Sequence, residues 1–279
     1  MARQSPRALG AYGLRLSGVN GIDEFLVDAP ADWTPVDLVL RSGAVATREG
    51  WTEGRRARFV TLSGGLVELD LDRGEAILTA AHTPRAEEIV HPYLSSIGAM
   101  AGYLKAQESF HAGAVEMAGG AWGVVGDREA GKSSTLAAFT VAGFPLVCDD
   151  TLVMRAGAAL AGPRSIDLRQ DAARSLGLGE ELGMVGTRER WRLRVGPVEP
   201  EVELRGWIFL EWGDELDVAP LPVPDVLSRL LQQRAVKLPP REPGAILELA
   251  SLRGLLLRRP RGLEGLSATI EAIVSSIES

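Results

Sequence analysis

The stretch Gly126-Asp127-Arg128-Glu129-Ala130-Gly131-Lys132-Ser133 has the spacing G-x-x-x-x-G-K-[ST], which is typical of a phosphate-binding loop. The apolar run 121–125 precedes it and predicts a buried strand. Residues 133–142 have apolar side chains at helical spacing and are followed by Gly143, which is suited to end a helix. The loop is therefore expected between a strand and a helix, the context that phosphate binding requires. The alternative is a glycine-rich turn that happens to precede a lysine.

Each residue type in this stretch has a part in holding a nucleotide. Glycines let backbone N–H groups turn inward as an anion nest at the start of a helix. Lys132 can reach the outer phosphates, and Ser133 can offer its hydroxyl to Mg²⁺. Glu129 is unusual, because a carboxylate repels a triphosphate unless it points to solvent or pairs with Arg128. The expected nucleotide-binding residues are Gly126, Asp127, Arg128, Glu129, Ala130, Gly131, Lys132, Ser133 and Ser134.

Composition narrows the class of protein. The 279 residues are 46% hydrophobic and 24% charged, which is ordinary for a soluble chain of one or two domains. With 30 Lys and Arg against 37 Asp and Glu, the net charge of −7 gives no overall attraction to nucleic acid. The sequence has no signal core and no apolar run of membrane-spanning length, and Cys148 is its one cysteine. We therefore expect a cytoplasmic protein with no nucleic-acid or membrane partner.

The first third of the chain predicts strands. Residues 14–16, 36–40, 58–62, 66–71 and 76–80 alternate or run apolar for strand length, with Gly, Pro and Asp between them. This pattern favours a sheet module or a sandwich, and it contains no catalytic cluster. Residues 87–107 have one apolar helical face and are expected to join two halves. The predicted fold class is α+β or α/β, with a β-rich N-terminal module at 1–86 and a nucleotide-binding domain at 87–279.

Three further residues are expected near the loop. A strand at 111–117 and the turn 118–120 lead into the strand before the loop, so a hairpin would bring His111 to the loop end. Residues 144–148 predict a strand that ends in Asp149 and Asp150, and ligands lie at the carboxyl ends of strands in open α/β sheets. One carboxylate could hold Mg²⁺ and the other accept a proton. The alternatives are a structural histidine and a plain Asp-Asp turn.

The second half of the chain is less informative. Arg188, Arg190, Arg192 and Arg194 alternate with other residues, which favours a solvated edge strand over a hairpin that faces a phosphate or an acidic peptide. Strands are expected at 203–211 and 254–258, a connector at 220–224, and helices at 226–236, 245–252 and 263–277. His91, which precedes Pro92, is interpreted as part of the first turn of the helix that follows.

His111, the loop and the Asp149-Asp150 pair, in this order, resemble HPr kinase/phosphorylase. The intervals are also similar: fifteen residues from His111 to Gly126 and twenty-four from Gly126 to Asp150. The phrases His91-Pro92-Tyr93-Leu94 and Phe110-His111-Ala112-Gly113-Ala114-Val115 resemble shorter HPr-kinase-like proteins found in gene clusters for modified peptides such as lasso peptides. The resemblance covers roughly residues 90 to 155.

The resemblance implies roles for these residues. Lys132 would bind the transferred phosphoryl group, Ser133 and Asp149 would lie at the metal, and Asp150 would accept the hydroxyl proton. His111 would lie next to the reacting phosphate. The cofactors would be ATP and Mg²⁺, and the nucleotide domain would fold like phosphoenolpyruvate carboxykinase, with a βαβ core in a mixed sheet.

The sequence departs from the family at several places. Glu129 and Ala130 replace a more usual pair that contains glycine. The candidate for the family's later metal-binding glutamate is Asp167, and residues 239–244 are only faintly similar to the loop linked to dephosphorylation. The sequence therefore leaves open whether the phosphorylase half of the family's activity accompanies the kinase half.

The expected function is an ATP-dependent kinase that transfers the γ-phosphate to a hydroxyl, on a Ser or Thr of a peptide or small protein. Two alternatives remain open: a nucleotide-binding regulatory or scaffold protein without transfer, and a kinase for a free small molecule. Family members are often oligomeric, so a homo-oligomer is a further expectation.

Overall fold

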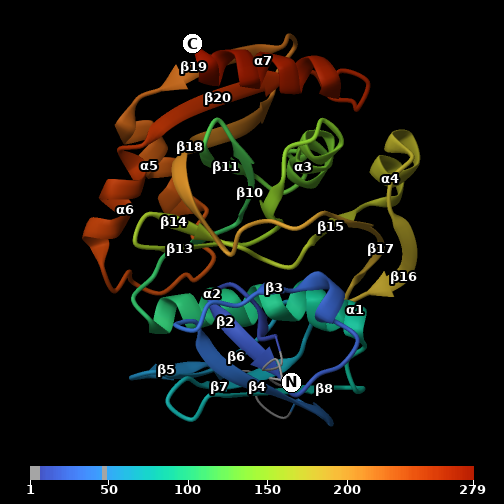
Figure 1. Cartoon of the computed structure of the whole chain (residues 1–279), viewed down its shortest axis with the longest axis vertical. Coiled ribbons are helices and arrows are strands. Elements are labelled where there is room, and N and C mark those ends of the chain that lie inside the picture. The colour runs from blue at the N-terminus through green and yellow to red at the C-terminus, as the bar shows by residue number, and fades with distance from the viewer. Residues whose placement is uncertain (1–6, 46–48) are drawn as a thin grey trace, which may run out of the picture.

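The fold is a mixed α/β arrangement with several sheets, seen in a computed structural model that describes residues 7–45 and 49–279. Two large sheets lie at opposite ends of the molecule, and a central helix lies between them (Figure 1). A third, smaller sheet lies to one side. No helix in the described part of the chain is both long and apolar enough to cross a membrane.

The first sheet is built from the strand-rich N-terminal segment. Its strands pair in the order β3-β1-β2-β4-β8-β7-β6-β5, so it is one mixed sheet and not a sandwich. Side chains of β8 alternate between buried and half-buried, because successive residues of a strand face opposite sides. The strands are Leu9–Ala11 (β1), Leu14–Ser17 (β2), Val27–Asp28 (β3), Thr34–Ser42 (β4), Trp51–Glu53 (β5), Arg56–Val60 (β6), Leu66–Asp70 (β7) and Glu75–Ala80 (β8).

The central helix α2 (Leu94–Leu104) follows a short helix α1 (Ala86–Glu88) and a π-helical turn, Ile89–Tyr93. Most of its residues are buried, as expected for a helix that is apolar on nearly every side. Its small residues allow close packing: a Cβ on Gly98 would lie 2.6 Å from the ring of Tyr12. The helix thereby fixes the first sheet against the rest of the chain.

The second sheet carries the predicted strand–loop–helix unit. Its order is β12-β10-β11-β18-β14-β13-β9, and β20 pairs with both β18 and β19. The β11, β18 and β20 strands are mutually parallel, while β10 is antiparallel to both β11 and β12. The strands are Ser109–Phe110 (β9), Ala112–Met117 (β10), Gly120–Gly126 (β11), Leu146–Cys148 (β12), Leu152–Arg155 (β13), Ala158–Leu160 (β14), Glu201–Trp212 (β18), Asp217–Leu221 (β19) and Arg253–Arg259 (β20).

Helices cover both faces of the second sheet. One core lies between this sheet, α2 and the first sheet, and it also takes in side chains of α5 (Val223–Gln232) and α6 (Pro243–Ala250). The other core lies against the opposite face, beneath α3 (Lys132–Val141) and α7 (Leu266–Glu278) (Figure 1). The first core contains residues on both sides of position 86, so the division into modules at 1–86 and 87–279 stays a prediction.

The third sheet corrects one interpretation of the sequence. Its order is β15-β17-β16, from Ser165–Leu168 (β15), Glu180–Val185 (β16) and Arg188–Arg194 (β17), with α4 (Gln170–Leu176) beside it. The arginine-rich strand β17 is therefore the middle strand, and the edge-strand interpretation is wrong. The expected connector at 220–224 is also wrong in part, because Pro220 belongs to β19; this strand pairs only with β20 among the described strands and tolerates the missing N–H.

Candidate active site

The 126–133 loop joins β11 to α3, as the sequence predicts. Glu129 (φ 71°) and Gly131 (φ 85°) adopt left-handed backbone conformations, and the Ala130 N–H closes the turn on the Asp127 carbonyl at 3.1 Å. Glycine is favoured at 131, because the positive φ strains other residues, and a Cβ there would also lie 2.5 Å from Nη2 of Arg259. Ser134 lies in the first turn of α3, and Ala130 is buried beneath the loop.

Lys132 is folded over the loop. Its Nζ donates to the carbonyl oxygens of Gly126 at 2.6 Å and Asp127 at 3.2 Å. Burial lowers the pKa of Lys132, although neighbouring carboxylates oppose the shift. The ammonium group is therefore placed where the loop's own backbone carbonyls converge.

The two acids of the loop face away from its centre. Glu129 is well exposed and accepts a hydrogen bond from Nη2 of Arg169 at 3.0 Å, which lowers the pKa of the carboxyl. Asp127 accepts from Nε2 of Gln233 at 2.8 Å. The acid that the sequence marks as unusual is thus paired, but with Arg169 and not with Arg128, and Arg128 instead lines the cavity described below.

Ser133 and Asp149 lie side by side at the ends of α3 and β12. The Ser133 hydroxyl lies 3.2 Å and 3.3 Å from the two carboxylate oxygens of Asp149, to which it can donate. The backbone N–H groups of Asp150 and Asp167 also donate to Asp149, at 2.8 Å and 3.3 Å. Burial, with the nearby charges of Asp150 and Asp167, raises the pKa of Asp149 to about 7.

This hydroxyl and carboxylate fit a Mg²⁺ ion. Mg²⁺ prefers oxygen ligands and is commonly held by one or two protein groups together with phosphate oxygens and water. A cation beside Asp149 would also favour the ionised carboxylate that burial disfavours. Residues 7–45 and 49–279 contain no cluster of three or more His, Cys, Asp or Glu side chains placed to hold a metal.

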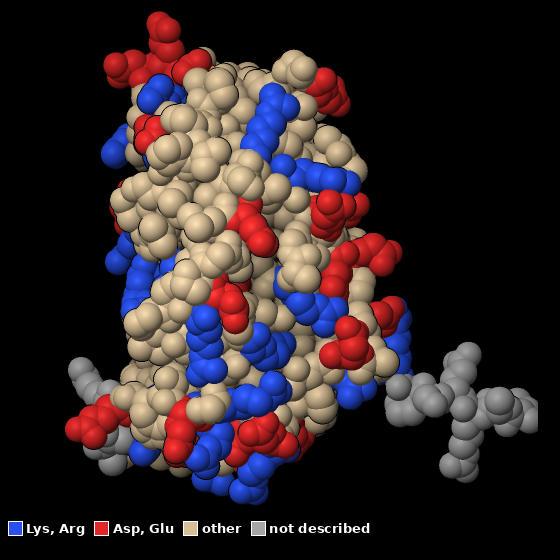
Figure 2. All heavy atoms as spheres, turned by 90° about the vertical axis from the view of Figure 1, so that its left-hand side faces the viewer, with Lys and Arg blue, Asp and Glu red and all other residues tan. Residues whose placement is uncertain are grey.

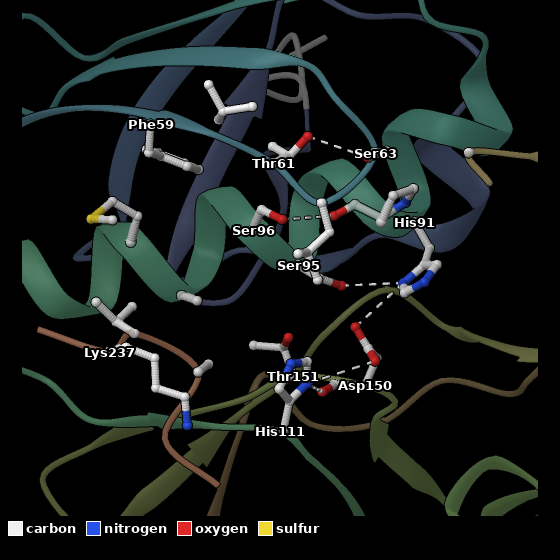
Figure 3. A pocket seen from close by; sticks show the side chains of 18 of the residues that line it. Phe59, Thr61, Ser63, His91, Ser95, Ser96, His111, Asp150, Thr151 and Lys237 are labelled. Atoms are coloured by element: carbon white, nitrogen blue, oxygen red, sulfur yellow. Dashed lines mark hydrogen bonds and ion pairs between the residues drawn. The ribbon is translucent and has the colours of Figure 1, made fainter. Parts of the chain in front are cut away.

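Asp150 lies between two histidines (Figure 3). Its carboxylate oxygens are 3.8 Å from Nδ1 of His91 and 3.9 Å from Nδ1 of His111, and the His111 ring also lies 3.3 Å from the Asp150 carbonyl. The backbone of Asp150 is left-handed (φ 64°). Burial raises the pKa of Asp150, but His91, His111, Arg190 and Lys132 together hold it below its usual value. Asp150 is therefore ionised where a hydrogen-bonding hydroxyl could reach it.

His91 is a site residue that the sequence interpretation missed. Its ring nitrogen Nδ1 lies 3.4 Å from the Ser95 hydroxyl, which lies 3.4 Å from the hydroxyl of Tyr12. Burial lowers the pKa of His91. The histidine does stand at the start of a helix, but its backbone is extended there and its ring turns toward Asp150. Only the fold brings these segments together, so no local pattern could have indicated the contact.

Asp167 has a different role from the metal ligand that the resemblance suggests. Its carboxylate, only 4% exposed, accepts from Nε and Nη2 of Arg192 at 2.7 Å and 2.8 Å. Arg190 lies 3.8 Å away on the same carboxylate. The side chain is thus occupied by guanidinium groups of β17, while the backbone N–H holds Asp149.

A cavity of about 800 Å³ opens above these residues. One wall is formed by β5, β6, the turn after β6 and the exposed side of α2. The opposite wall is formed by the 126–133 loop, the β16–β17 turn and residues 233–238. Among the residues with assigned roles, His111, Arg128, Lys132 and Asp150 line this cavity, together with His91.

Comparisons with known proteins find similarity among solved structures. No family model matches the chain, and no curated protein matches it. The solved structure of the Hpr(Ser) kinase/phosphatase from Coxiella burnetii is similar over 62% of this chain and 99% of that chain, with 12% identity and a TM-score of 0.31. The roles of the residues therefore depend on the geometry given above.

Proposed function

We propose that this protein is an ATP-dependent kinase that transfers the γ-phosphate of ATP to a hydroxyl group. The observation that carries the proposal is the convergence of Lys132, Ser133 and the Asp149-Asp150 pair at the carboxyl ends of β11 and β12, which lie on either side of β10. A cation over a glycine loop, an oxygen pair for Mg²⁺ and an ionised carboxylate are groups suited to phosphoryl transfer.

In the proposed mechanism the protein acts by position and charge. The 126–133 loop and the start of α3 hold the phosphates, and Lys132 leaves its backbone carbonyls to bind the outer phosphate oxygens. Ser133 and Asp149 hold Mg²⁺, which would neutralise phosphate charge when bound. Asp150 accepts the proton of the acceptor hydroxyl as its oxygen bonds to the γ-phosphorus and ADP departs.

His91 and His111 orient the proposed base. Both rings approach the Asp150 carboxylate, from α2's side and from the hairpin before the loop. They favour the ionised carboxylate, which can accept a proton at neutral pH. The acceptor would be a Ser or Thr of a peptide or small protein, in keeping with the resemblance to peptide-modifying kinases. The cavity of about 800 Å³ has room for an acceptor larger than a water molecule.

One observation favours a second candidate, a nucleotide-binding protein without transfer. Lys132 is held by two loop carbonyls, and breaking these bonds reduces the gain from phosphate contact. The histidines beside Asp150 favour the kinase, because binding of phosphates alone gives them no role.

Transfer from γ-labelled ATP separates the two candidates. With water or a Ser peptide as acceptor, we expect wild type to release or transfer label, and Asp150→Asn to keep Mg·ATP affinity but lose at least about a hundredfold in rate. Glu116→Gln, on the strand next to β11 and outside the cavity, is the matched control and should behave like wild type. Equal rates for wild type and Asp150→Asn would refute the assignment of the base.

A further inference from the structure

The cavity has an excess of positive charge that the phosphates of one nucleotide do not account for. Among the described lining residues, six are Lys or Arg and one, Asp150, is acidic. The chain as a whole has a net charge of −7. On the face that carries α5 and α6, acidic and basic side chains are interspersed (Figure 2). The excess of positive charge is therefore found in the lining of this cavity and not in the chain as a whole. The six cations are Arg58, Arg128, Lys132, Arg188, Arg190 and Lys237.

Four of the six cations belong to the nucleotide end. Lys132 and Arg128 are part of the 126–133 loop, and Arg188 and Arg190 come from the strand beside it. Burial, together with the charges of Arg128, Arg169 and Arg190, lowers the pKa of Arg188. Arg190 is also partly paired with Asp167 at 3.8 Å. The negative charges on the phosphates of Mg·ATP can balance the positive charges of these four side chains.

Arg58 and Lys237 come from different segments at the other end. Lys237 and Phe59, the residue after Arg58, lie toward one side of the cavity, and His91 and Asp150 lie toward the other (Figure 3). Arg58 lies in β6 of the first sheet, next to its edge strand β5. Both residues are distant in the chain from the 126–133 loop.

Both side chains have hydrogen-bonding capacity to spare. Nε of Arg58 is buried without a hydrogen-bond partner among the described residues, and its guanidinium group forms only a long ion pair with Glu68, at 3.7 Å. Lys237 donates to the backbone carbonyl of Gln232 at 2.6 Å, which leaves two of its ammonium protons for other acceptors. A buried donor without a hydrogen-bond partner raises the free energy of the folded protein, so an anion that accepts this hydrogen bond would be stabilised here.

The segment that carries Lys237 is anchored at both ends of the cavity. Gln233 donates to Asp127 of the 126–133 loop, and Nη2 of Arg241 donates to the carbonyl of Gly54 in the β5–β6 turn at 3.0 Å. Between them, Arg234 forms a buried ion pair with Glu108 at 2.8 Å. Residues 233–241 therefore form a fixed wall, and Lys237 has a defined place on it.

We propose that the acceptor carries a carboxylate near the hydroxyl that receives the phosphoryl group, and that Arg58 and Lys237 bind this carboxylate. The inference rests on the proposed kinase function. The hydroxyl lies at Asp150 and the carboxylate lies toward the first sheet, with Phe59 and Met100 providing apolar contact between them. An acidic peptide segment and a small hydroxy acid both have this chemistry, and the test distinguishes them.

The first assay measures binding, in saturating Mg·ADP. Three rhodamine-labelled heptapeptides have a central Ser and differ only in its two neighbours, which are Glu, Gln or Lys. We expect the Glu peptide to bind at least about tenfold more tightly than the Gln peptide, with the Lys peptide weakest. Glycerate is added as an unlabelled competitor, and binding of glycerate without binding of the Glu peptide would identify a small hydroxy acid as the source of the carboxylate.

Variants locate the site. Arg58→Gln and Lys237→Gln should each remove about tenfold of the preference for Glu over Gln, while Arg58→Lys should retain most of it because the charge remains. Arg73→Gln, on the exposed turn between β7 and β8 of the same sheet, is the matched control and should leave the preference unchanged. Equal binding of the Glu and Gln peptides without glycerate binding, or a preference that survives both cavity variants, would overturn the proposal.

A transfer assay with γ-labelled ATP keeps the two proposals distinguishable. A carboxylate preference that depends on Arg58 and Lys237, without any transfer, would leave the anion site standing and refute the kinase. Transfer to the Gln peptide with the same kcat and KM as to the Glu peptide would leave the kinase standing and refute the carboxylate site.

Discussion

The buried ion pair between Arg234 and Glu108 gives the sharpest prediction about stability. The two side chains are 8% and 4% exposed, and Nε of Arg234 donates to Glu108 at 2.8 Å. Nη1 also donates to the Leu238 carbonyl at 2.6 Å, in the wall that carries Lys237. Arg234→Met would remove all these bonds and leave a buried carboxylate without its partner.

The expected cost follows from these contacts. Loss of one partner of a buried pair costs about 3 to 5 kcal/mol, and the lost bond to a carbonyl adds about 1 kcal/mol. We therefore expect Arg234→Met to lower the free energy of unfolding by roughly 4 to 6 kcal/mol. Arg234→Met/Glu108→Leu should recover most of this, because no charge is then left buried.

Urea unfolding, followed by tryptophan fluorescence, measures the effect as a shift of the midpoint at unchanged slope. The control is Arg205→Met, which breaks an exposed pair with Glu203 at 2.8 Å and should cost less than about 1 kcal/mol. A cost below about 1 kcal/mol for Arg234→Met, or no recovery in the double variant, would refute the account of residues 233–241 as a wall fixed by this pair.

Three further predictions concern the buried Lys105, the surroundings of the proposed base and the 126–133 loop. Burial lowers the pKa of Lys105 to about 8, so the folded state releases this proton at a lower pH than the unfolded chain does. The free energy of unfolding should therefore rise by up to roughly 3 kcal/mol between about pH 8 and 10.4, and Lys105→Met should abolish this rise in urea titrations at different pH. Ser95→Ala removes the hydroxyl next to His91 and should lower turnover about tenfold at unchanged Mg·ATP affinity, whereas Ser95→Thr should retain turnover; an Ala variant with wild-type turnover would contradict this role. Gly131→Ala should weaken Mg·ATP binding at least about tenfold in calorimetric titrations, because a guanidinium nitrogen lies 2.5 Å from the new Cβ. Gly143→Ala, also at positive φ but in open space, should cost about 1 kcal/mol of stability and leave binding unchanged.

The part of the site that the sequence predicts is the part built from neighbouring residues. The strand, loop and helix around Lys132 form one continuous pattern, and the structure has β11, the loop and α3 in those places. His111 could be placed because a tight hairpin fixes its strand beside β11. Asp150 could be placed because an apolar strand ends at the residue before the acid pair.

The rest of the site depends on packing between distant segments. His91 reaches Asp150 only because α2 lies between the two sheets. Arg188 lines the cavity from the start of β17, in the separate third sheet. The alternating arginines look alike in sequence, yet Arg192 is buried against Asp167 while Arg194 lies at the surface near Glu24. Burial of a charge depends on which partner faces it, and the sequence pattern does not contain that information.

Short strands set a similar limit on the fold. The β5 strand has three residues with little alternation in burial, and β19 contains a proline that local rules assign to a connector. Both strands exist because a longer partner, β6 or β20, supplies their hydrogen bonds. The single mixed sheet of residues 9–80 also depends on parallel pairings of β2, β4 and β8 that join segments distant in the chain.

The most direct test of the proposed function is calorimetric titration of Mg·ATP into wild type, Lys132→Ala and Lys237→Ala. The two variants remove a lysine from the same cavity, but only Lys132 belongs to the loop. We predict saturable binding by wild type and Lys237→Ala, and at least about a hundredfold weaker binding by Lys132→Ala. No binding by wild type at protein concentrations that would reveal micromolar affinity, or equal binding by all three proteins, would contradict the assignment of the 126–133 loop as the phosphate site of a kinase.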